Sequence, residues 1–354
     1  MSRSGNFFED FRVGQTFRHA TPRTISDGDT ALYIALTGSR VPLHCAAPFA
    51  RSLGYRGNTV DDLLAFHIAF GKTVPDISLN AVANLGYADA RFIEPVYPGD
   101  TLRAESEVVG LRQNSNGTSG VVWVRSRAFN QFDREVLSWV RWVMVVKADP
   151  AAPAPAAVVP TLAPHVSADT LPVPPFLQLD SYDTAATGGT RLWDDYAPGE
   201  RIDHPAGMTV VDAEHALATR LYQNTARVHF DALAMKDTQF GRRLMYGGHV
   251  ISVCRALAFD GLENALSIAA INGGTHSGPT FGDDTLYAQT RVLERWELPG
   301  RAGLGALRLR LLGIKNMPPA KLDQPQGEKD GKAQYHPNVV LDLDYTVLMP
   351  RRKH

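Results

Sequence analysis

The residues with the clearest chemical potential lie between Leu221 and Ser252. His229 stands in a short polar run, and Gly247 opens an apolar-patterned run 18 positions later. A histidine titrates near neutral pH, so it can take up and return protons. The first N–H groups of a helix have no partner within the helix and can stabilise negative charge on a bound oxygen. The pattern therefore predicts an acid/base site that faces backbone donors.

The same spacing recurs in the first half of the chain. Three pairs of residues share an offset of 185 positions: His19 and His204, Thr24 and Thr209, and His44 and His229. Segments 8–14 and 193–199 are similar at the same offset, and 97–102 is similar to 281–286 at an offset of 184. Several matches in one order and at nearly one spacing indicate a duplication. We expect a first repeat in 1–147, a linker in 148–185 and a second repeat in 186–354.

Each half shows the same order of elements. Helices are predicted at 29–36, 61–70, 213–222 and 248–259, and strands at 101–112, 120–130, 136–147, 285–297, 306–315 and 339–349. A helix followed by a run of strands predicts an α+β domain, in which an antiparallel sheet wraps a central helix. The proline-rich stretch 148–176 is predicted to be a linker, because proline removes ladder donors. The polar stretch 317–337 is predicted to be a long loop.

The composition is that of an ordinary globular protein, with 44% hydrophobic and 21% charged residues. A formal net charge of −1 argues against nucleic acid as a partner, and the absence of any apolar stretch of about 20 residues argues against a membrane span. Cys45 and Cys254 stand in apolar settings, which favours buried thiols and, with a polar N-terminus, a cytoplasmic location. Nucleotide-binding and CxxC patterns are missing, which disfavours redox, NTPase and zinc functions.

The run around His229 resembles the motif of the MaoC-like enoyl-CoA hydratase family, D-x-N-P-x-H-x-D followed by a glycine-opened central helix. In the second half, Asn224 stands at the first position, Asp231 at the last and Gly247 at the helix start. The resemblance extends over most of both halves and implies a double hot-dog fold. It also implies reversible addition of water to an acyl-CoA double bond, with no metal or cofactor, because coenzyme A is part of the substrate.

The resemblance implies a role for each matched residue. His229 is expected to be the acid/base, and Gly247, with Gly248 beside it, the donor to the thioester oxygen. Asn224 departs from the family's Asp, and an amide is not a useful general base, so we expect it to position water or substrate. Asp231 either orients His229 or caps the turn that follows.

Longer segments, among them GLRQNSNG and FGRRLMYGGHVIS, are similar to a branch of the family whose substrate carries a second carboxylate. A pocket for that substrate needs a cation. Arg255 lies two helical turns past Gly247 and is the expected partner. Three other arginines are candidates, either there or at the phosphates of coenzyme A: Arg227, Arg242 and Arg243. His249, in the central helix, is expected either to line the site or to pack in the core, whereas His276 is expected to be structural.

The corresponding site in the first half is predicted to be degraded. It keeps His44, but Ser39 and Val41 replace the motif's acid and amide. When the two halves are aligned without a gap, Asp62 corresponds to Gly247 at the helix start. If the loop of the first half is five residues shorter, Gly57 corresponds to it instead. We expect this half to supply structure and part of an acyl-CoA tunnel.

Other functions remain compatible with the sequence. A hot-dog thioesterase would hydrolyse the thioester, a hydratase could act on a related branched or dicarboxylic enoyl-CoA, and a non-catalytic protein would only bind acyl-CoA. Hot-dog sheets commonly pair, so the resemblance implies a homo-oligomer, although two repeats in one chain can satisfy that pairing internally.

Overall fold

The computed structural model describes residues 4–329 and 332–352. In the first half the helices and strands are β1 (Thr16–Arg18), β2 (Arg23–Thr24), α1 (Asp27–Thr37), α2 (Pro42–Cys45), α3 (Ala47–Ser52), α4 (Asp62–Thr73), β3 (Ala81–Phe92), β4 (Thr101–Gln113), β5 (Ser119–Phe129) and β6 (Glu135–Val146). A π-helical turn, η2 (Val74–Ser78), extends α4.

The second half repeats this plan. Its helices and strands are α5 (Thr184–Thr187), β7 (Arg201–Thr209), α6 (Asp212–Leu221), α7 (Ala232–Met235), α8 (Gly247–Leu257), β8 (Ser267–Thr275), β9 (Thr285–Glu297), β10 (Leu304–Lys315), β11 (Gln326–Lys329), β12 (Lys332–Tyr335) and β13 (Val339–Pro350). A short 3₁₀ turn, η5 (Arg227–His229), lies between α6 and α7.

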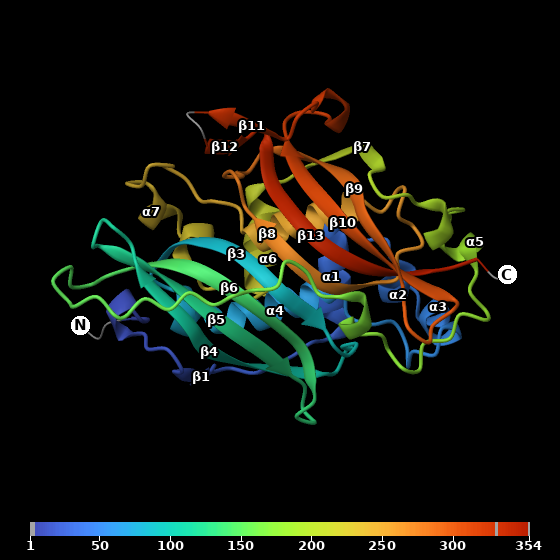
Figure 1. Cartoon of the computed structure of the whole chain (residues 1–354), viewed down its shortest axis with the longest axis horizontal. Helices are drawn as coiled ribbons and strands as arrows, with labels where there is room; N and C mark the ends of the chain where they lie inside the picture. The colour runs from blue at the N-terminus through green and yellow to red at the C-terminus, as the bar shows by residue number, and fades with distance from the viewer. Residues whose placement is uncertain (1–3, 330–331, 353–354) are drawn as a thin grey trace.

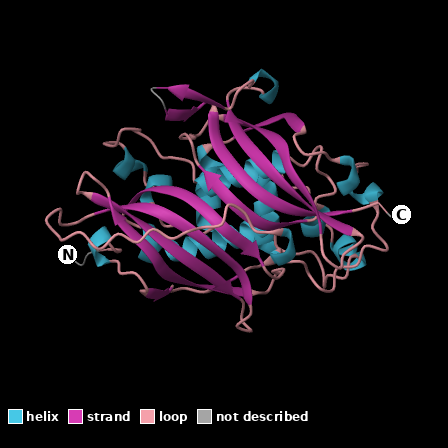
Figure 2. Cartoon of the chain, in the orientation of Figure 1, coloured by secondary structure: helices cyan, strands magenta, loops and turns pink. Residues whose placement is uncertain are grey.

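One antiparallel sheet runs through the molecule, and the helices α4 and α8 pack against one face of it (Figure 1, Figure 2). The strand order is β1-β4-β5-β6-β3-β8-β13-β10-β9-β7, with β2 beside β4. Strands of the first half occupy one end of the sheet and strands of the second half the other. This is the α+β double hot-dog architecture that the resemblance implied.

The two halves meet where β3 pairs with β8, with Ala90 opposite Ile271 and Tyr87 opposite Gly274. Neither strand was predicted. Both are rich in alanine and glycine, which are weak strand formers, and neither has the alternation of a half-buried strand. The pairing places the start of α8 from the second half beside strands of the first half. Side chains from both halves therefore reach the same pocket.

Similar hydrogen bonds recur at matching positions in the two halves. The first partners of the matched bonds are 185 positions apart and the second partners 184. His19 Nε2 lies 2.7 Å from Ser106 Oγ in the first half, and His204 Nε2 lies 2.9 Å from Thr290 Oγ1 in the second. Likewise, Thr24 Oγ1 lies 2.7 Å from Thr101 Oγ1, and Thr209 Oγ1 lies 2.7 Å from Thr285 Oγ1. These histidines and threonines, which indicated the repeat in the sequence, thus form hydrogen bonds between the entry segment of each half and its sheet.

The central helices are buried on all sides, as their near-continuous apolar sequences require. They differ at their first turns. At α4 the side chain of Asp61 caps the helix by accepting a hydrogen bond from Leu63 N at 3.0 Å. At α8 the preceding residue is Tyr246, and no side chain caps the helix. The second half therefore leaves open a helix start that the first half closes.

Some expectations need correction. The stretch 317–337, predicted to be a loop, contains the β11–β12 hairpin. Cys254 is buried as expected, but Cys45 is exposed. The proline-rich stretch does lack long strands, with one isolated bridge between Val158 and Leu111. Among the described residues, every helix is too short or too polar to span a bilayer.

Candidate active site

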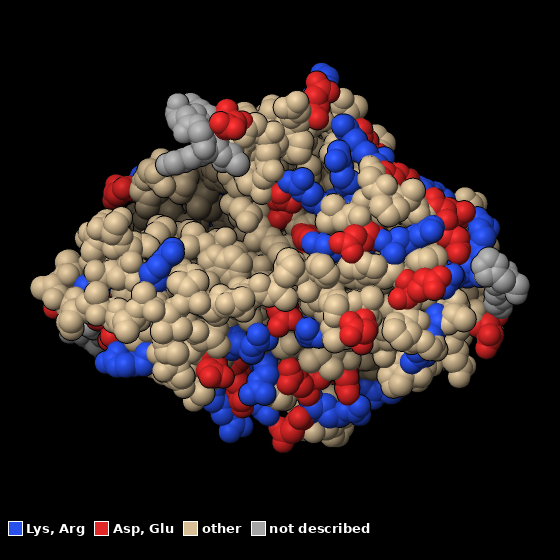
Figure 3. Space-filling model, in the orientation of Figure 1, with Lys and Arg blue, Asp and Glu red and all other residues tan. Residues whose placement is uncertain are grey.

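A pocket of about 400 Å³ lies at the start of α8. It has the size of a small-molecule site. Its walls come from the start of β3, the segment after α7 and the segment after β8. Figure 3 shows a hollow between the segment that carries α7 and the β11–β12 hairpin, and the visible walls of this hollow are largely uncharged. Among the predicted site residues, Asn224, His229 and Gly247 line this pocket.

His229 is held with one ring nitrogen free to act as a base. Its Nδ1 lies 3.1 Å from the carbonyl oxygen of Leu244. Because a carbonyl oxygen only accepts, Nδ1 carries the proton and Nε2 keeps its lone pair. Burial lowers the pKa of His229 to about 4, so the ring is neutral at physiological pH. A neutral imidazole with a free Nε2 can take a proton from water.

The start of α8 is fixed by hydrogen bonds from neighbouring segments. The N–H of Tyr246 donates to His215 Nε2 at 2.8 Å, and Met245 N donates to Thr280 O at 2.9 Å. Burial lowers the pKa of His215 to about 2, which keeps it neutral and able to accept. These contacts aim the uncapped first turn, beginning at Gly247, into the pocket. The helix dipole adds partial positive charge there.

His276 packs directly on Gly247. A Cβ added to Gly247 would lie 2.4 Å from Cε1 of this ring, so only glycine allows the approach. His276 Nε2 lies 3.2 Å from the hydroxyl of Tyr87, which comes from β3 of the first half. Burial, with His229 nearby, lowers the pKa of His276 to about 4. Two neutral imidazoles therefore line the pocket at the helix start, and the sequence had suggested only one.

Asn224 is buried at the edge of the pocket. Its Oδ1 accepts a hydrogen bond from Ala226 N at 3.0 Å, which fixes the direction of the amide. Within the described part of the chain, its Nδ2 has no hydrogen-bond partner and remains available as a donor. An amide held this way can orient a water molecule or a substrate oxygen, but it cannot remove a proton.

Three other predicted residues lie outside the pocket. Asp231 is the N-cap of α7, where its Oδ1 accepts from Ala234 N at 3.0 Å, and it does not orient His229. Gly248 is buried, and its lack of a side chain makes room for the rings of Tyr246 and His67 rather than for a ligand. His249 is buried with its Nδ1 3.2 Å from a tyrosine hydroxyl, so of its two expected roles it has the core one.

The expectation for Arg255 does not fit the structure. Eight residues advance the helix by about 12 Å, so the far end of α8 reaches the corresponding site of the first half instead. Arg255 lines that other pocket. Arg227 and Arg242 are exposed and line neither, and Arg242 donates to Gly282 O at 2.9 Å. Arg243 forms an ion pair with Asp212 at 3.3 Å and lines a separate hollow.

The buried arginine that does line the pocket is Arg141, from β6 of the first half. Asn84 and Tyr87, from β3, lie on the same side of the pocket. Sequence reasoning missed all three. Arg141 left a signal, because it is the one charge inside the apolar run VLSWVRWVMVV. Asn84 and Tyr87 lie on a strand that was not predicted, so nothing pointed to them.

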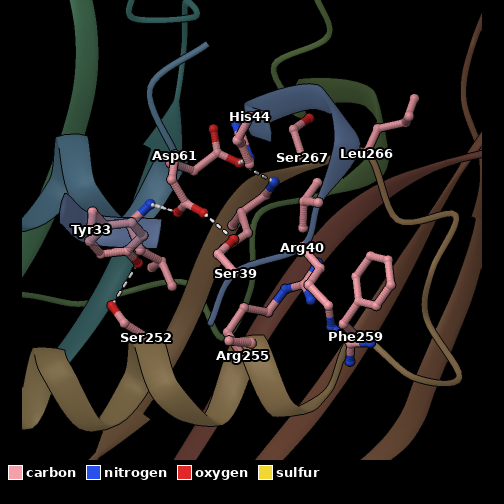
Figure 4. Close-up of a pocket in the computed structure, with 15 residues that line it drawn as sticks. Tyr33, Ser39, Arg40, His44, Asp61, Ser252, Arg255, Phe259, Leu266 and Ser267 are labelled. Carbon is pink, nitrogen blue, oxygen red and sulfur yellow. Dashed lines mark hydrogen bonds and ion pairs between the residues drawn. The ribbon is translucent and has the colours of Figure 1, made fainter. Parts of the chain in front are cut away.

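The corresponding site of the first half is filled by its own side chains (Figure 4). The remaining space is about 20 Å³, room for little more than a water molecule. The helix start falls on Asp62, so the alternative at Gly57 is wrong. Asp62 Oδ2 accepts from Ile268 N at 2.7 Å and lies 3.9 Å from His44 Nε2. Burial raises the pKa of Asp62 to about 6.

Further contacts close this site. Ser39, which replaces the motif's acid, donates to Asp61 at 3.0 Å. His44 Nδ1 lies 2.8 Å from Thr59 Oγ1, the counterpart of the bond from His229 to Leu244. The scaffold of the second-half site is thus present in the first half, but Asp62 begins the central helix where the second half has Gly247.

Comparison with known proteins places this geometry in context. Residues 1–316 match the family described as mesaconyl-CoA hydratase. The chain is 57% identical over 348 residues to β-methylmalyl-CoA dehydratase of Chloroflexus aurantiacus, with 98% of each chain covered. It is 55% identical over 350 residues to mesaconyl-CoA hydratase of Cereibacter sphaeroides, with 99% of each covered.

Solved structures of similar proteins have the same fold. A MaoC-domain protein described as a putative dehydratase, from Chloroflexus aurantiacus, superimposes with a TM-score of 0.95 at 56% identity, covering 99% of this chain and 98% of that one. A conserved protein of Mycobacterium tuberculosis, described as having a double hot-dog fold, superimposes with a TM-score of 0.75 at 25% identity and 98% coverage of both.

Proposed function

The chain belongs to the mesaconyl-CoA hydratase family, and we propose that it is a hydro-lyase that interconverts mesaconyl-CoA and β-methylmalyl-CoA at the start of α8. Near-complete coverage of two such enzymes at 55–57% identity supports the substrate. The observation that carries the chemistry is the free Nε2 of a neutral His229 in a pocket that the uncapped helix start also lines.

The reaction adds water across a double bond conjugated to a thioester. We place the thioester oxygen at the N–H of Gly247, where the helix dipole and the backbone donor stabilise the charge that develops on it. This polarisation makes the β-carbon electrophilic. His229 Nε2 removes a proton from the attacking water as the new C–O bond forms. The resulting imidazolium returns a proton to the α-carbon, so atoms and charge balance without any redox change.

Asn224 is assigned to the water. Its Oδ1 is committed to the backbone, which leaves the amide N–H groups to hold the water oxygen while His229 acts on the proton. The single histidine then does the work that an Asp and a His share in the family motif. His276, packed on Gly247, also lines the pocket and restricts how the thioester can lie.

We assign the coenzyme A phosphates to a second hollow, of about 560 Å³, which Asn224 also lines. Three cations surround this hollow: Lys72, Arg220 and Arg243. Phosphate groups are bound well by such clusters. Asn224 lies on the walls of both hollows, so the thioester would lie beside it, with the acyl group on one side and the nucleotide on the other.

One assay tests the proposed function. Purified protein is incubated with mesaconyl-CoA, products are identified by mass, and free thiol is followed with a thiol reagent. We expect a gain in mass of one water, loss of enoyl absorbance and no thiol release. Release of free coenzyme A would instead indicate a thioesterase, and binding without turnover would indicate a carrier protein. Crotonyl-CoA, which lacks the second carboxylate, is the matched control and should be a poor substrate.

A further inference from the structure

Arg141 is a buried cation without an acidic partner among the described residues. It is 1% exposed and lies in the otherwise apolar strand β6. Its Nη2 donates to Thr73 Oγ1 at 2.8 Å and to Ser78 Oγ at 3.3 Å, both neutral groups. Its Nε is buried with no hydrogen-bond partner. Burying a charge without an acidic partner is unfavourable, so Arg141 is suited to pair with an anionic ligand.

The guanidinium remains charged at neutral pH. Burial lowers the pKa of Arg141 only to about 10. The nearest large group is the ring of Phe70, whose centroid lies 4.1 Å from the guanidinium carbon. A cation over an aromatic face is partly stabilised, but this contact uses the face of the guanidinium and leaves the in-plane N–H of Nε without a hydrogen bond. In-plane N–H groups of this kind bind carboxylates.

Asn84 adds a second unsatisfied group to the same pocket. Both its Nδ2 and its Oδ1 are buried without hydrogen-bond partners. Asn84 lines the pocket together with Arg141. A native structure leaves few buried polar groups unpaired, and two neighbours in one pocket point to a ligand that pairs with them. An amide N–H₂ and a guanidinium together match the two oxygens of a carboxylate.

Arg141 is connected to the start of α8 through Tyr87 and His276, and all three side chains line the same pocket. Tyr87 and Arg141 are directly opposite each other on β3 and β6, so their side chains lie on one face about 5 Å apart. The hydroxyl of Tyr87 is 3.2 Å from His276, which packs on Gly247. A continuous line of contacts thus leads from the cation to the helix start where the thioester oxygen is placed.

We propose that Arg141 and Asn84 form the subsite for the free carboxylate of the substrate. The inference rests on the proposed function and deepens it, because mesaconyl-CoA is a dicarboxylic acid with only one carboxyl in the thioester. The second repeat then supplies the acid/base group and the oxyanion donor. The first repeat, whose own site is closed, supplies the side chains that decide which acyl group is accepted.

The test compares mesaconyl-CoA with tiglyl-CoA, in which a methyl group replaces the carboxylate. In the Arg141→Met variant, we expect kcat/KM for mesaconyl-CoA to fall on the order of 100-fold. The value for tiglyl-CoA should stay within about threefold, so the preference for the dicarboxylic substrate is lost. Asn84→Ala should lower the preference in the same direction by a smaller factor. An equal loss with both substrates would show that Arg141 is only structural and would overturn the proposal.

Arg255→Met is the matched control. Arg255 is also a buried arginine with an unpaired nitrogen, Nη1, but it lines the closed pocket of the first half. Its replacement should leave the substrate preference unchanged. If Arg255→Met lost as much of the preference for mesaconyl-CoA over tiglyl-CoA as Arg141→Met does, the assignment to Arg141 would be contradicted. If Arg141→Met does not fold, as judged by circular dichroism, Arg141→Lys keeps the charge but not the planar fork and should give an intermediate loss of preference.

Binding separates this proposal from the proposed function. Methylsuccinyl-CoA and 2-methylbutyryl-CoA have no double bond, so they report recognition without turnover. We expect the dicarboxylic ligand to bind the wild type more tightly by calorimetry, and Arg141→Met to remove that difference. Wild-type protein that binds with this preference yet fails to hydrate mesaconyl-CoA would refute the proposed function alone. Equal binding of both ligands by the wild type would refute the subsite.

Discussion

His44 Nε2 lies 3.9 Å from Oδ2 of Asp62, the first residue of α4. In the second repeat the corresponding histidine, His229, lines a pocket together with Gly247, the first residue of α8. One scaffold therefore appears twice, but the first copy carries its own carboxylate where the second leaves space. In the proposed reaction, the negative charge at the open site develops on the thioester oxygen of the substrate.

Replacing the two histidines should have opposite results. We expect His229→Ala to lower kcat by about 10²- to 10⁴-fold, because it removes the only proposed proton carrier. His44→Ala should leave kcat nearly unchanged, since its site has no room for a substrate. Both variants are assayed with mesaconyl-CoA after a check of folding by circular dichroism. Loss of turnover in a folded His44→Ala protein would show that the first repeat is active.

The pH dependence of kcat/KM should show a base with a depressed pKa. Burial lowers the pKa of His229 to about 4, and the reaction needs the neutral ring. The rate should therefore be flat around neutral pH and fall tenfold per pH unit below about 4. His276 has a similarly lowered pKa, so the profile of His276→Asn is the control and should keep the same acid limb. An acid limb near pH 6.5 would mean that the base is solvated.

The close packing at the start of α8 gives a third prediction. In Gly247→Ala the new Cβ would come within 2.4 Å of the ring of His276, so the ring or the helix must shift. We expect a lower melting temperature and at least a tenfold loss of kcat, since displacement of the donor by about 1 Å weakens its contact with the oxyanion. The double variant Gly247→Ala/His276→Ala removes the clash and should regain stability. A single variant as stable as the wild type would show that the ring moves freely.

The sequence predicted the parts of the fold that strong patterns encode. The strands β4, β5, β6, β9, β10 and β13 are rich in valine, leucine or aromatic residues, and each was found within about two residues of its predicted bounds. The central helices were found as well, because their apolar runs begin at Asp62 and Gly247. The joint between the halves was not predicted. It depends on β3 and β8, whose alanines and glycines carry no strand signal of their own.

The candidate site likewise contains residues that the sequence predicted and residues that it did not. His229, Asn224 and Gly247 follow one another along one stretch of chain, so spacing was enough to connect them. Arg141 lies more than 80 residues away and reaches the pocket only through sheet pairing, which a single sequence does not reveal. The choice of Arg255 failed for a geometrical reason. Eight residues along α8 move Arg255 about 12 Å from Gly247, so it lines the pocket of the first half instead.

The second hollow leads to a prediction about coenzyme A. Arg220, Arg243 and Lys72 line it, and burial lowers the pKa of Lys72 to about 8. If the nucleotide phosphates bind there, Arg220→Met and Arg243→Met should each raise KM for mesaconyl-CoA by about three- to tenfold, with little change in kcat. The effect should weaken at high salt, because exposed charges are screened. Arg227→Met is the control, since Arg227 is exposed but lines neither hollow.

Mesaconyl-pantetheine makes this last test decisive, because it keeps the thioester and the pantetheine arm but lacks the nucleotide phosphates. Its KM should be the same in the wild type and in both variants. A rise in KM for the truncated substrate would mean that Arg220 and Arg243 act on the shape of the pocket and not on the phosphates. No change with mesaconyl-CoA itself would place the nucleotide on another surface, such as the mouth of the hollow in Figure 3.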